Sequence, residues 1–378
     1  MFRRRLLAPT LIVFLSGVPC PAPACSLCGG LLQQAPTWRQ EAVQASARLI
    51  LFGTLVNPRS STNTELAIDA VLRPDPALNG KKLIDLGRYL PISDPKNPPR
   101  FLVFCDVNDD KLDPYRGVPI TGADSLDYIK KALALDPKDP GGNLDFYFRY
   151  LENPDKEVAH DAFLEFARAN DLQIGNASSK LSAEKLRAWI TDPQTPPERV
   201  SLYAFLLGGC GGDADADFLA AQLNGDGERT VSSYDGCMGG YIHLRPRDGW
   251  DKATAVLRDS RKPLPMRLAV VRTVRMYHGW RPQENHDAIL KCLTAMIAQG
   301  ELADIAVEDL RKWKWWDLTP DILAVYGMPG FDAPIMKRAI VRYALTCKDD
   351  PSNQFVAERR RAEPELVKEV EESLQFEK

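Results

Sequence analysis

The sequence predicts a multidomain β plus α fold, in which a small β-barrel or sandwich is followed by an α-solenoid, an array of stacked helix pairs. Short β-rich runs separated by turn-rich gaps occupy residues 47–105, a pattern typical of small barrels and sandwiches. Beyond residue 143 the apolar residues have helical spacing, and a helix–turn–helix unit recurs. A hydrophobic content of 44% is enough to form a core and argues against wholesale disorder.

The first 28 residues have the layout of a secretory signal peptide followed by a cysteine pair. Residues 1–5 include three arginines, an apolar run extends from Leu6 to Val18, and Ala22-Pro23-Ala24 is a small-x-small cleavage site. The run is shorter than the roughly twenty residues of a spanning helix. We therefore expect cleavage of residues 1–24, a periplasmic or secreted protein, and no integral membrane segment after cleavage. Lipoprotein processing at Cys25 is the alternative.

The charge balance disfavours two classes of partner. The chain has a net charge of −3, and removal of residues 1–24, which contain three arginines, lowers it to −6. Nucleic acids and anionic membranes attract basic surfaces, so we expect neither of them as a partner. Eight cysteines are present and Cys20 leaves with the signal peptide, so export would place the other seven where disulfides persist.

We expect residues 25–136 to form the β domain. A short amphipathic helix over 30–46 precedes strands at 48–56, 64–72, 82–86 and 100–105, where apolar and β-branched residues cluster or alternate. Prolines between positions 91 and 99 predict a loop before the last strand, because proline lacks the N–H that a strand uses.

The segment Pro137–Gly142 marks the boundary to a helical domain over 137–378. Helix–turn–helix units follow, and their second helices begin near six positions: Val158, Val200, Ser232, Met266, Leu302 and Ile335. The spacings lie between 32 and 42 residues, which is the signature of an α-solenoid. The Ser232 unit is the weakest, because the glycine-containing segment Tyr234–Gly240 interrupts it.

Two segments resemble the second helix of a HEAT repeat. Pro265–Val274 and Pro334–Leu345 have apolar residues at three-to-four spacing, small alanines for close contacts, and basic residues facing outward. The resemblance to HEAT-like repeats covers roughly residues 143–375. It implies a curved solenoid whose concave face docks another molecule.

The N-terminal half resembles a netrin-type OB barrel, the group that contains the tissue inhibitors of metalloproteinases. The resemblance rests on Cys25 and Cys28, a short helix, the strand Leu49–Leu55, and a later strand that ends in Cys105. It implies that the cysteines are tied to the barrel, with Cys105 as a candidate bridge partner, and that the first residue can chelate the zinc of a protease. The spacing here is Cys-x-x-Cys, where that family has Cys-x-Cys. The whole chain resembles exported bacterial proteins that join such a barrel to helical repeats.

The pair Cys25-Ser26-Leu27-Cys28 has four interpretations. A thioredoxin-type redox pair follows a strand, and no strand precedes this one. A c-type haem site has histidine where Gly29 stands, and a zinc site needs two further close ligands. We favour a structural role, in which the cysteines attach the mature N-terminus to the barrel.

Two further cysteine pairs differ in their surroundings. Cys210 and Cys237 lie in glycine-flanked segments that we interpret as turns of neighbouring repeats, so they are a candidate disulfide. Cys292 and Cys347 lie within apolar helix patterns and are expected to be buried thiols.

We predict no catalytic, cofactor-binding or metal-binding residue. The acidic segments Asp106–Lys111 and Asp213–Asp217 lack the glycine and glutamate of a calcium loop, and we interpret them as a hairpin loop and a helix N-terminus. Gly208–Gly212 lacks the Lys-Ser/Thr of a phosphate loop and fits the end of a helix. The four histidines have no metal-binding spacing.

Trp313, Trp315 and Trp316 are the best candidate interaction surface, because tryptophan is favoured at binding hot spots. Packing between repeats is the alternative. We therefore predict a non-enzymatic binding or scaffold protein that engages another protein or an envelope component through its helical-repeat surface. Thiol–disulfide or metalloprotease-inhibitor activity at Cys25-x-x-Cys28 is the alternative function.

Overall fold

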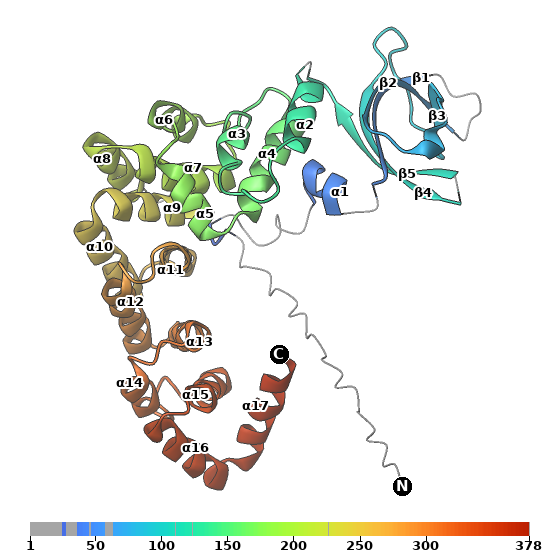
Figure 1. Cartoon of the computed structure of the whole chain (residues 1–378). Helices are drawn as coiled ribbons and strands as arrows, with labels where there is room; N and C mark the ends of the chain where they lie inside the picture. Colours follow the sequence, from blue (N-terminus) through green and yellow to red (C-terminus); the bar gives the residue numbers. More distant parts are fainter. Residues whose placement is uncertain are drawn as a thin grey trace, which may run out of the picture.

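The computed structural model describes residues 25–27, 36–44, 47–56, 63–109, 111–122, 124–225 and 227–377. They form a curled sheet and a long, curved array of helices that continues from it (Figure 1). The prediction of a β part followed by an α part is confirmed at this level. The predicted signal peptide and Cys28 lie outside the described residues.

The sheet is a curled half-barrel of five antiparallel strands in the order β3-β2-β1-β4-β5. Its strands are β1 (Leu49–Val56), β2 (Glu65–Arg73), β3 (Leu83–Asp85), β4 (Arg100–Asn108) and β5 (Lys111–Ile120). Four of them match predicted strands. The fifth, β5, contains Pro114 and Pro119 and was not predicted; it lies at the edge of the sheet, where proline is tolerated.

The sheet buries both faces of its central strands, which explains why β1 is a continuous apolar run. Leu49 and Leu51 lie in a core inside the curl, together with Cys105 of β4. The alternate residues, Ile50 and Phe52, belong to the large core that includes the helices. The side chain of a strand residue points to the face opposite that of its neighbour, so the sheet and the helices share one continuous core.

One α-helix precedes the sheet, and the helical part of the chain begins directly after it. α1 (Trp38–Gln44) lies between the N-terminal segment and β1, and α2 (Ser125–Leu133) comes after β5. The remaining helices are α3 (Leu144–Phe148), α4 (Lys156–Arg168), α5 (Asp171–Ser178), α6 (Ala183–Thr191), α7 (Pro197–Cys210), α8 (Asp213–Gln222), α9 (Glu228–Leu244), α10 (Pro246–Arg258), α11 (Leu264–Trp280), α12 (His286–Gln299), α13 (Ala303–Trp313), α14 (Thr319–Ala324), α15 (Pro334–Cys347), α16 (Asp350–Ala362) and α17 (Pro364–Phe376).

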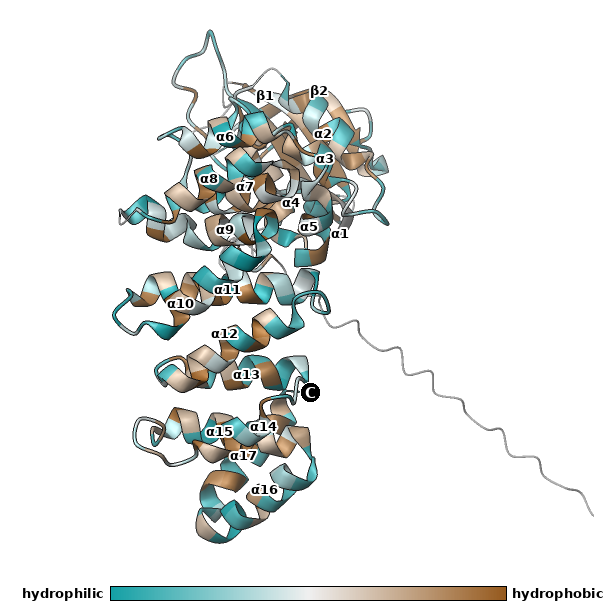
Figure 2. Ribbon diagram, turned by 90° about the vertical axis from the view of Figure 1, so that its left-hand side faces the viewer, coloured by the Kyte–Doolittle hydropathy of each residue, from teal (hydrophilic) through white to brown (hydrophobic). Residues whose placement is uncertain are grey.

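The helices from α10 onward alternate between the two sides of the arc. α10, α12, α14 and α16 lie on its outer side, and α11, α13, α15 and α17 on its inner side (Figure 1). Each of the six predicted second-helix starts falls within four residues of the start of a helix: α4, α7, α9, α11, α13 or α15. The helices carry hydrophobic stripes beside hydrophilic ones (Figure 2), as helices buried on one side do.

Glycines bring α7 and α9 into close contact. A Cβ atom at Gly236 would lie 1.7 Å from the carbonyl oxygen of Ser201, and one at Gly240 would lie 2.2 Å from that of Ala204. The interpretation of Tyr234–Gly240 as an interruption is therefore wrong: the whole segment lies inside α9. Its glycines cost helix propensity but allow the two backbones to pack together.

Polar pairs join successive helices at nearly constant sequence separation. Asp235 of α9, which is 2% exposed, accepts a hydrogen bond from Ser201 of α7 at 2.6 Å and one from Arg272 of α11 at 2.5 Å. Arg275 of α11 donates to Asp309 of α13 at 2.8 Å. The members of these three pairs are 34, 37 and 34 residues apart, so the polar contacts repeat with the same period as the helices.

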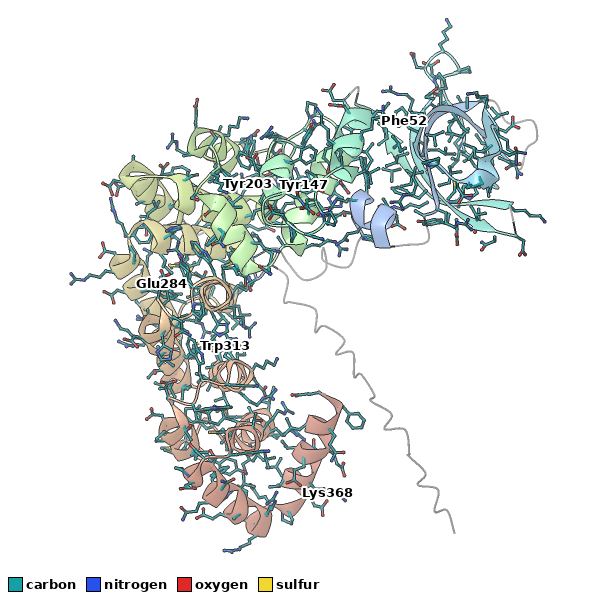
Figure 3. All side chains as sticks on the ribbon, in the orientation of Figure 1. Phe52, Tyr147, Tyr203, Glu284, Trp313 and Lys368 are labelled. Carbon is teal, nitrogen blue, oxygen red and sulfur yellow. The ribbon has the colours of Figure 1, made fainter. Side chains whose placement is uncertain are left out.

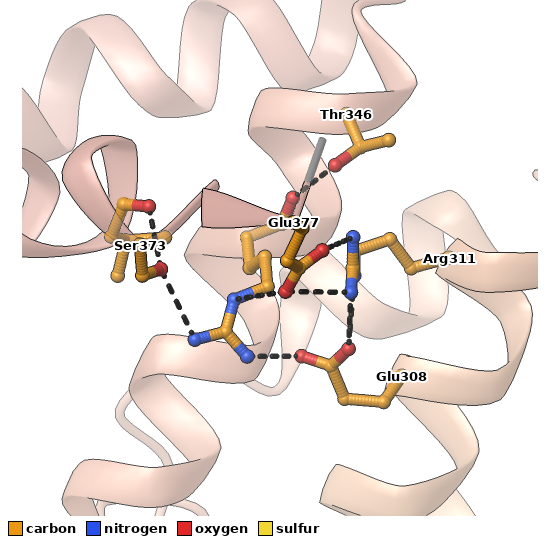
Figure 4. Close-up of polar contacts among 7 residues, drawn as sticks. Glu308, Arg311, Thr346, Ser373 and Glu377 are labelled. Atoms are coloured by element: carbon orange, nitrogen blue, oxygen red, sulfur yellow. Dashed lines mark hydrogen bonds and ion pairs between the residues drawn. The ribbon is translucent and has the colours of Figure 1, made fainter. Parts of the chain in front are cut away.

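The pattern continues to the end of the array, where Glu308 of α13 lies between two arginines (Figure 4). Arg311 of α13 is 2.9 Å from Glu308, and Arg342 of α15 is 2.7 Å from it. Arg311 also pairs at 2.9 Å with Glu377, just beyond α17. This network fixes α13, α15 and the C-terminal residues relative to one another.

Candidate functional site

The predicted N-terminal site contacts a helix that lies far along the chain. The main-chain N–H of Ser26 donates to Asp171 Oδ1 at 2.8 Å, and its hydroxyl donates to Oδ2 at 2.7 Å. Asp171 begins α5. The flanking Cys25 and Leu27 are 1% and 4% exposed, within the core that includes the helices. The helical part therefore holds Ser26, a contact that the sequence did not predict, and the core around Cys25 and Leu27 also includes residues of the sheet.

Asp171 occupies a tightly enclosed position. A Cβ atom at Gly279 of α11 would lie 2.6 Å from its Oδ2, so glycine leaves room for the carboxylate. Burial raises the pKa of Asp171 to about 6, although the hydrogen bonds from Ser26 act in the opposite direction. Here the carboxylate anchors the N-terminal segment; its oxygens are occupied by Ser26.

Two more buried carboxylates, Asp161 of α4 and Asp155 at its N-cap, hold neighbouring segments. Asp161 accepts the N–H of Trp38 at 2.7 Å and the hydroxyl of Tyr128 at 2.6 Å. Asp155 accepts the N–H of Gly122 at 2.8 Å, close to the end of β5. Burial raises the pKa of Asp161 to about 7. These contacts attach α1 and the end of the sheet to the helices, so we assign the carboxylates a structural role.

The prediction that Cys105, Cys210 and Cys237 form disulfides is wrong, because all three are free thiols in the structure. Cys105 lies in the core of the sheet and Cys237 inside α9, 0% and 2% exposed, and burial raises the pKa of each to about 12. Cys210 is the last residue of α7. Cys25 is disulfide-bonded, and Cys105 is not its partner.

Three of the expectations for other motifs hold. The acidic segment after Cys105 belongs to the β4–β5 hairpin, in which Asn108 pairs with Lys111. Asp213 begins α8, and Asp215 in its first turn accepts the N–H of Gly212 at 2.8 Å, as a carboxylate at a helix N-terminus does. Cys292 is a buried free thiol as expected, whereas Cys347 is a free thiol that is only half-buried, so its predicted burial is wrong. Within the described residues, no group of three or more histidine, cysteine, aspartate or glutamate side chains is placed to hold a metal ion.

Two of the predicted tryptophans join two histidines in an aromatic cluster, which we define as His278, His286, Trp313 and Trp315. His278 of α11 stacks on Trp313 of α13, with ring centroids 3.9 Å apart and planes at 9°. Trp315 lies 4.5 Å from His286 and 5.5 Å from Trp313. All four side chains are half-buried, and Figure 3 labels Trp313 beside α13.

Local backbone geometry places Trp315 in the cluster. Lys314 adopts a left-handed conformation with φ of 59° and ends α13, and the N–H of Trp315 donates to the carbonyl of Leu310 at 3.0 Å. A left-handed residue commonly closes a helix in this way. Trp316, the third predicted tryptophan, instead contacts Tyr343 of α15 edge-on at 5.1 Å and packs between helices.

The cluster is apolar and edged by charges of both signs. Burial lowers the pKa of His278 to about 4, so its ring is neutral at neutral pH. Lys312 and Lys314 are exposed beside the tryptophans, and Asp317 Oδ2 lies 3.6 Å from His286 Nε2. Aromatic side chains surrounded by polar groups are the composition of a protein-contact surface.

Sequence reasoning selected the tryptophans of this cluster but missed its histidines. His278 lies on α11 and Trp313 on α13. They are far apart in the sequence, so no local pattern pairs them. The helical period is the one signal in the sequence that brings α11 beside α13.

No helix among the described residues has the length and apolar character needed to cross a membrane. No family model, curated protein or solved structure matches the chain.

Proposed function

We propose that the protein is an exported, non-enzymatic scaffold that binds another protein or an envelope component on the inner side of its helical array. The observation that carries the proposal is the aromatic cluster. Trp313 and Trp315 keep part of their surface exposed, whereas the neighbouring apolar residues of α11 and α13 are almost all buried. Half-exposed tryptophan with polar surroundings is typical of binding hot spots.

The proposal takes the helical array as a HEAT-like solenoid. The start positions of the helices and the polar pairs at 34-residue separation support this interpretation, since a solenoid repeats the same contacts between neighbouring units. It also takes the half-barrel as an OB-like domain, supported by five strands in a partly open sheet. Export rests on the basic, apolar and small-residue layout of residues 1–24.

The burial of the N-terminal segment weighs against the alternative functions. A redox-active cysteine needs access to solvent and substrate, whereas Cys25 is 1% exposed. A zinc-chelating inhibitor needs a first residue that can enter the active site of a protease, and Ser26 is held by Asp171. We therefore retain scaffold binding alone as the proposed function.

Site-specific photo-crosslinking tests the proposal in the cells that produce the protein. A benzophenone amino acid replaces Trp315 in one variant and Ala255, an exposed residue of the outer helix α10, in the matched control. We expect a discrete crosslinked partner from position 315 and none from position 255. Absence of a crosslink at 315, or the same products at both positions, would overturn the proposal.

A further inference from the structure

A pocket, which we name the edge pocket, lies between α9, α10 and the start of α11, beside the end of α8. Its volume is about 530 Å³, within the range of small-molecule sites. None of the described residues that line it belongs to the aromatic cluster, so the two sites can be perturbed separately.

The inner wall of the edge pocket is apolar. Leu223, Val256 and Met266 line the pocket and are 4%, 5% and 8% exposed, within the large core that includes the helices. Val231 of α9 adds a further apolar side chain. Burial of the apolar body of a ligand against this wall is favourable, because it removes apolar surface from water.

Tyr234 of α9 brings a hydrogen-bond donor to this wall. It lines the pocket and is 2% exposed, and its hydroxyl forms no hydrogen bond with any described residue. Three other buried tyrosines, Tyr128, Tyr203 and Tyr277, donate their hydroxyls to a carboxylate or a carbonyl oxygen. A buried hydroxyl without a partner is unfavourable, and an acceptor on a ligand would satisfy it. Burial raises the pKa of Tyr234 to about 12, so the phenol keeps its proton at neutral pH.

Two lysines give the pocket an excess of positive charge. Lys252 donates to Asn224 Oδ1 at 3.2 Å, and neither its ammonium nor that of Lys262 pairs with a carboxylate in the described part of the chain. Among the described lining residues the one carboxylate is Asp259, whose two oxygens accept from the Arg261 guanidinium at 2.9 and 3.1 Å. This ion pair balances the charge of Asp259, so the lysines favour an anion.

We propose that the edge pocket binds a small organic carboxylate. The apolar body of the ligand packs on the inner wall, and its two oxygens are matched by one hydroxyl, that of Tyr234, and one ammonium without another side-chain partner, that of Lys262. The inference goes beyond the scaffold function, which concerns the inner side of the array.

Isothermal titration calorimetry with octanoate and cinnamate, one aliphatic and one aromatic carboxylate, tests the proposal. We expect saturable binding with a Kd of about 1 mM or tighter and much weaker binding of the neutral analogues octanol and cinnamyl alcohol. Tyr234→Phe should weaken the carboxylates about tenfold, the effect of a hydrogen bond to a charged group, and Lys262→Gln several-fold. Tyr89→Phe, at a position 52% exposed in the β part of the chain, is the matched control and should leave binding unchanged.

Melting temperatures give a second measurement. Without ligand, Tyr234→Phe should raise the melting temperature, because it removes a buried hydroxyl that has no partner. Octanoate should raise the melting temperature of the wild type more than that of Tyr234→Phe. A lower melting temperature of the variant without ligand would show that a protein group holds the hydroxyl, and would contradict the proposal.

Three calorimetric results would overturn the inference: no saturable binding of either carboxylate, equally tight binding of the alcohols, or unchanged affinity in Tyr234→Phe. Crosslinking at position 315 is measured without these ligands, so any of these results would leave the scaffold function standing.

Discussion

The close contact between α7 and α9 predicts that adding a single methyl group at Gly236 destabilises the protein. Replacing Gly236 by alanine places a Cβ atom 1.7 Å from the carbonyl oxygen of Ser201. A main-chain oxygen cannot rotate away as a side chain can, so the helices must separate. Overpacking of this kind costs about 1–3 kcal/mol, and we take the upper end.

The higher helix propensity of alanine stabilises the variant, so this gain is subtracted from the cost of overpacking. Alanine is better than glycine in a helix interior by about 1 kcal/mol, so we expect Gly236→Ala to reduce the free energy of unfolding by about 2 kcal/mol. The corresponding fall in melting temperature is roughly 4 °C. Without the close contact, the same change would stabilise the protein.

Thermal and urea denaturation followed by circular dichroism measure this effect. The control is Ser232→Ala, an exposed position one turn earlier on α9, where only propensity changes and a gain of a few tenths of a kcal/mol is expected. If Gly236→Ala raised the melting temperature as much as Ser232→Ala does, the packing of α7 against α9 would be refuted.

Three other predictions concern protons, thiols and ion pairs. The pKa of Asp161 rises from 3.8 to about 7 on folding, so its contribution to stability is complete below about pH 4 and is lost as the pH rises through 7. The Asp161→Asn variant should lack this loss of stability. Parallel curves of stability against pH for the variant and the wild type would contradict the prediction. The free cysteines among the described residues are Cys105, Cys210, Cys237, Cys292 and Cys347. Alkylation in guanidinium without reductant should label all of them, as measured by peptide mass spectrometry. A cysteine of this set that stays unlabelled would show a disulfide and contradict the structure. Glu308→Gln weakens the pairs with Arg311 and Arg342 and should lower the free energy of unfolding by about 1 kcal/mol. This difference from the wild type should shrink in 1 M NaCl, where charges are screened. A difference that does not depend on salt would argue against an electrostatic origin.

The elements that the sequence predicted are those with a local pattern. β1 and β4 are apolar runs, and the second helices have apolar residues at helical spacing and often proline at their first turn. β5 was missed because its two prolines oppose strand formation everywhere except at an edge, and edge position is a property of the whole sheet.

The features that the sequence did not predict depend on contacts between distant residues. Cys237 was placed in a turn because its glycine neighbours usually end helices; only the approach of α7 explains them. The docking of Ser26 joins residues 145 positions apart, and no local pattern encodes such a pairing. The tryptophans of the aromatic cluster were selected by residue type. Their histidine partners became evident only from the contact between α11 and α13.

The buried carboxylates of α4 and α5 also set the order in which the chain can complete its fold. Ribosomes release the N-terminal part of a chain first. The hydrogen bond of Trp38 to Asp161 can form only after a further 123 residues have been made, and that of Ser26 to Asp171 only after 145. Until Asp161 and Asp171 have been made, neither of these hydrogen bonds can form. The segment around Cys25 and Leu27 can therefore complete its packing only after nearly half of the chain has been made.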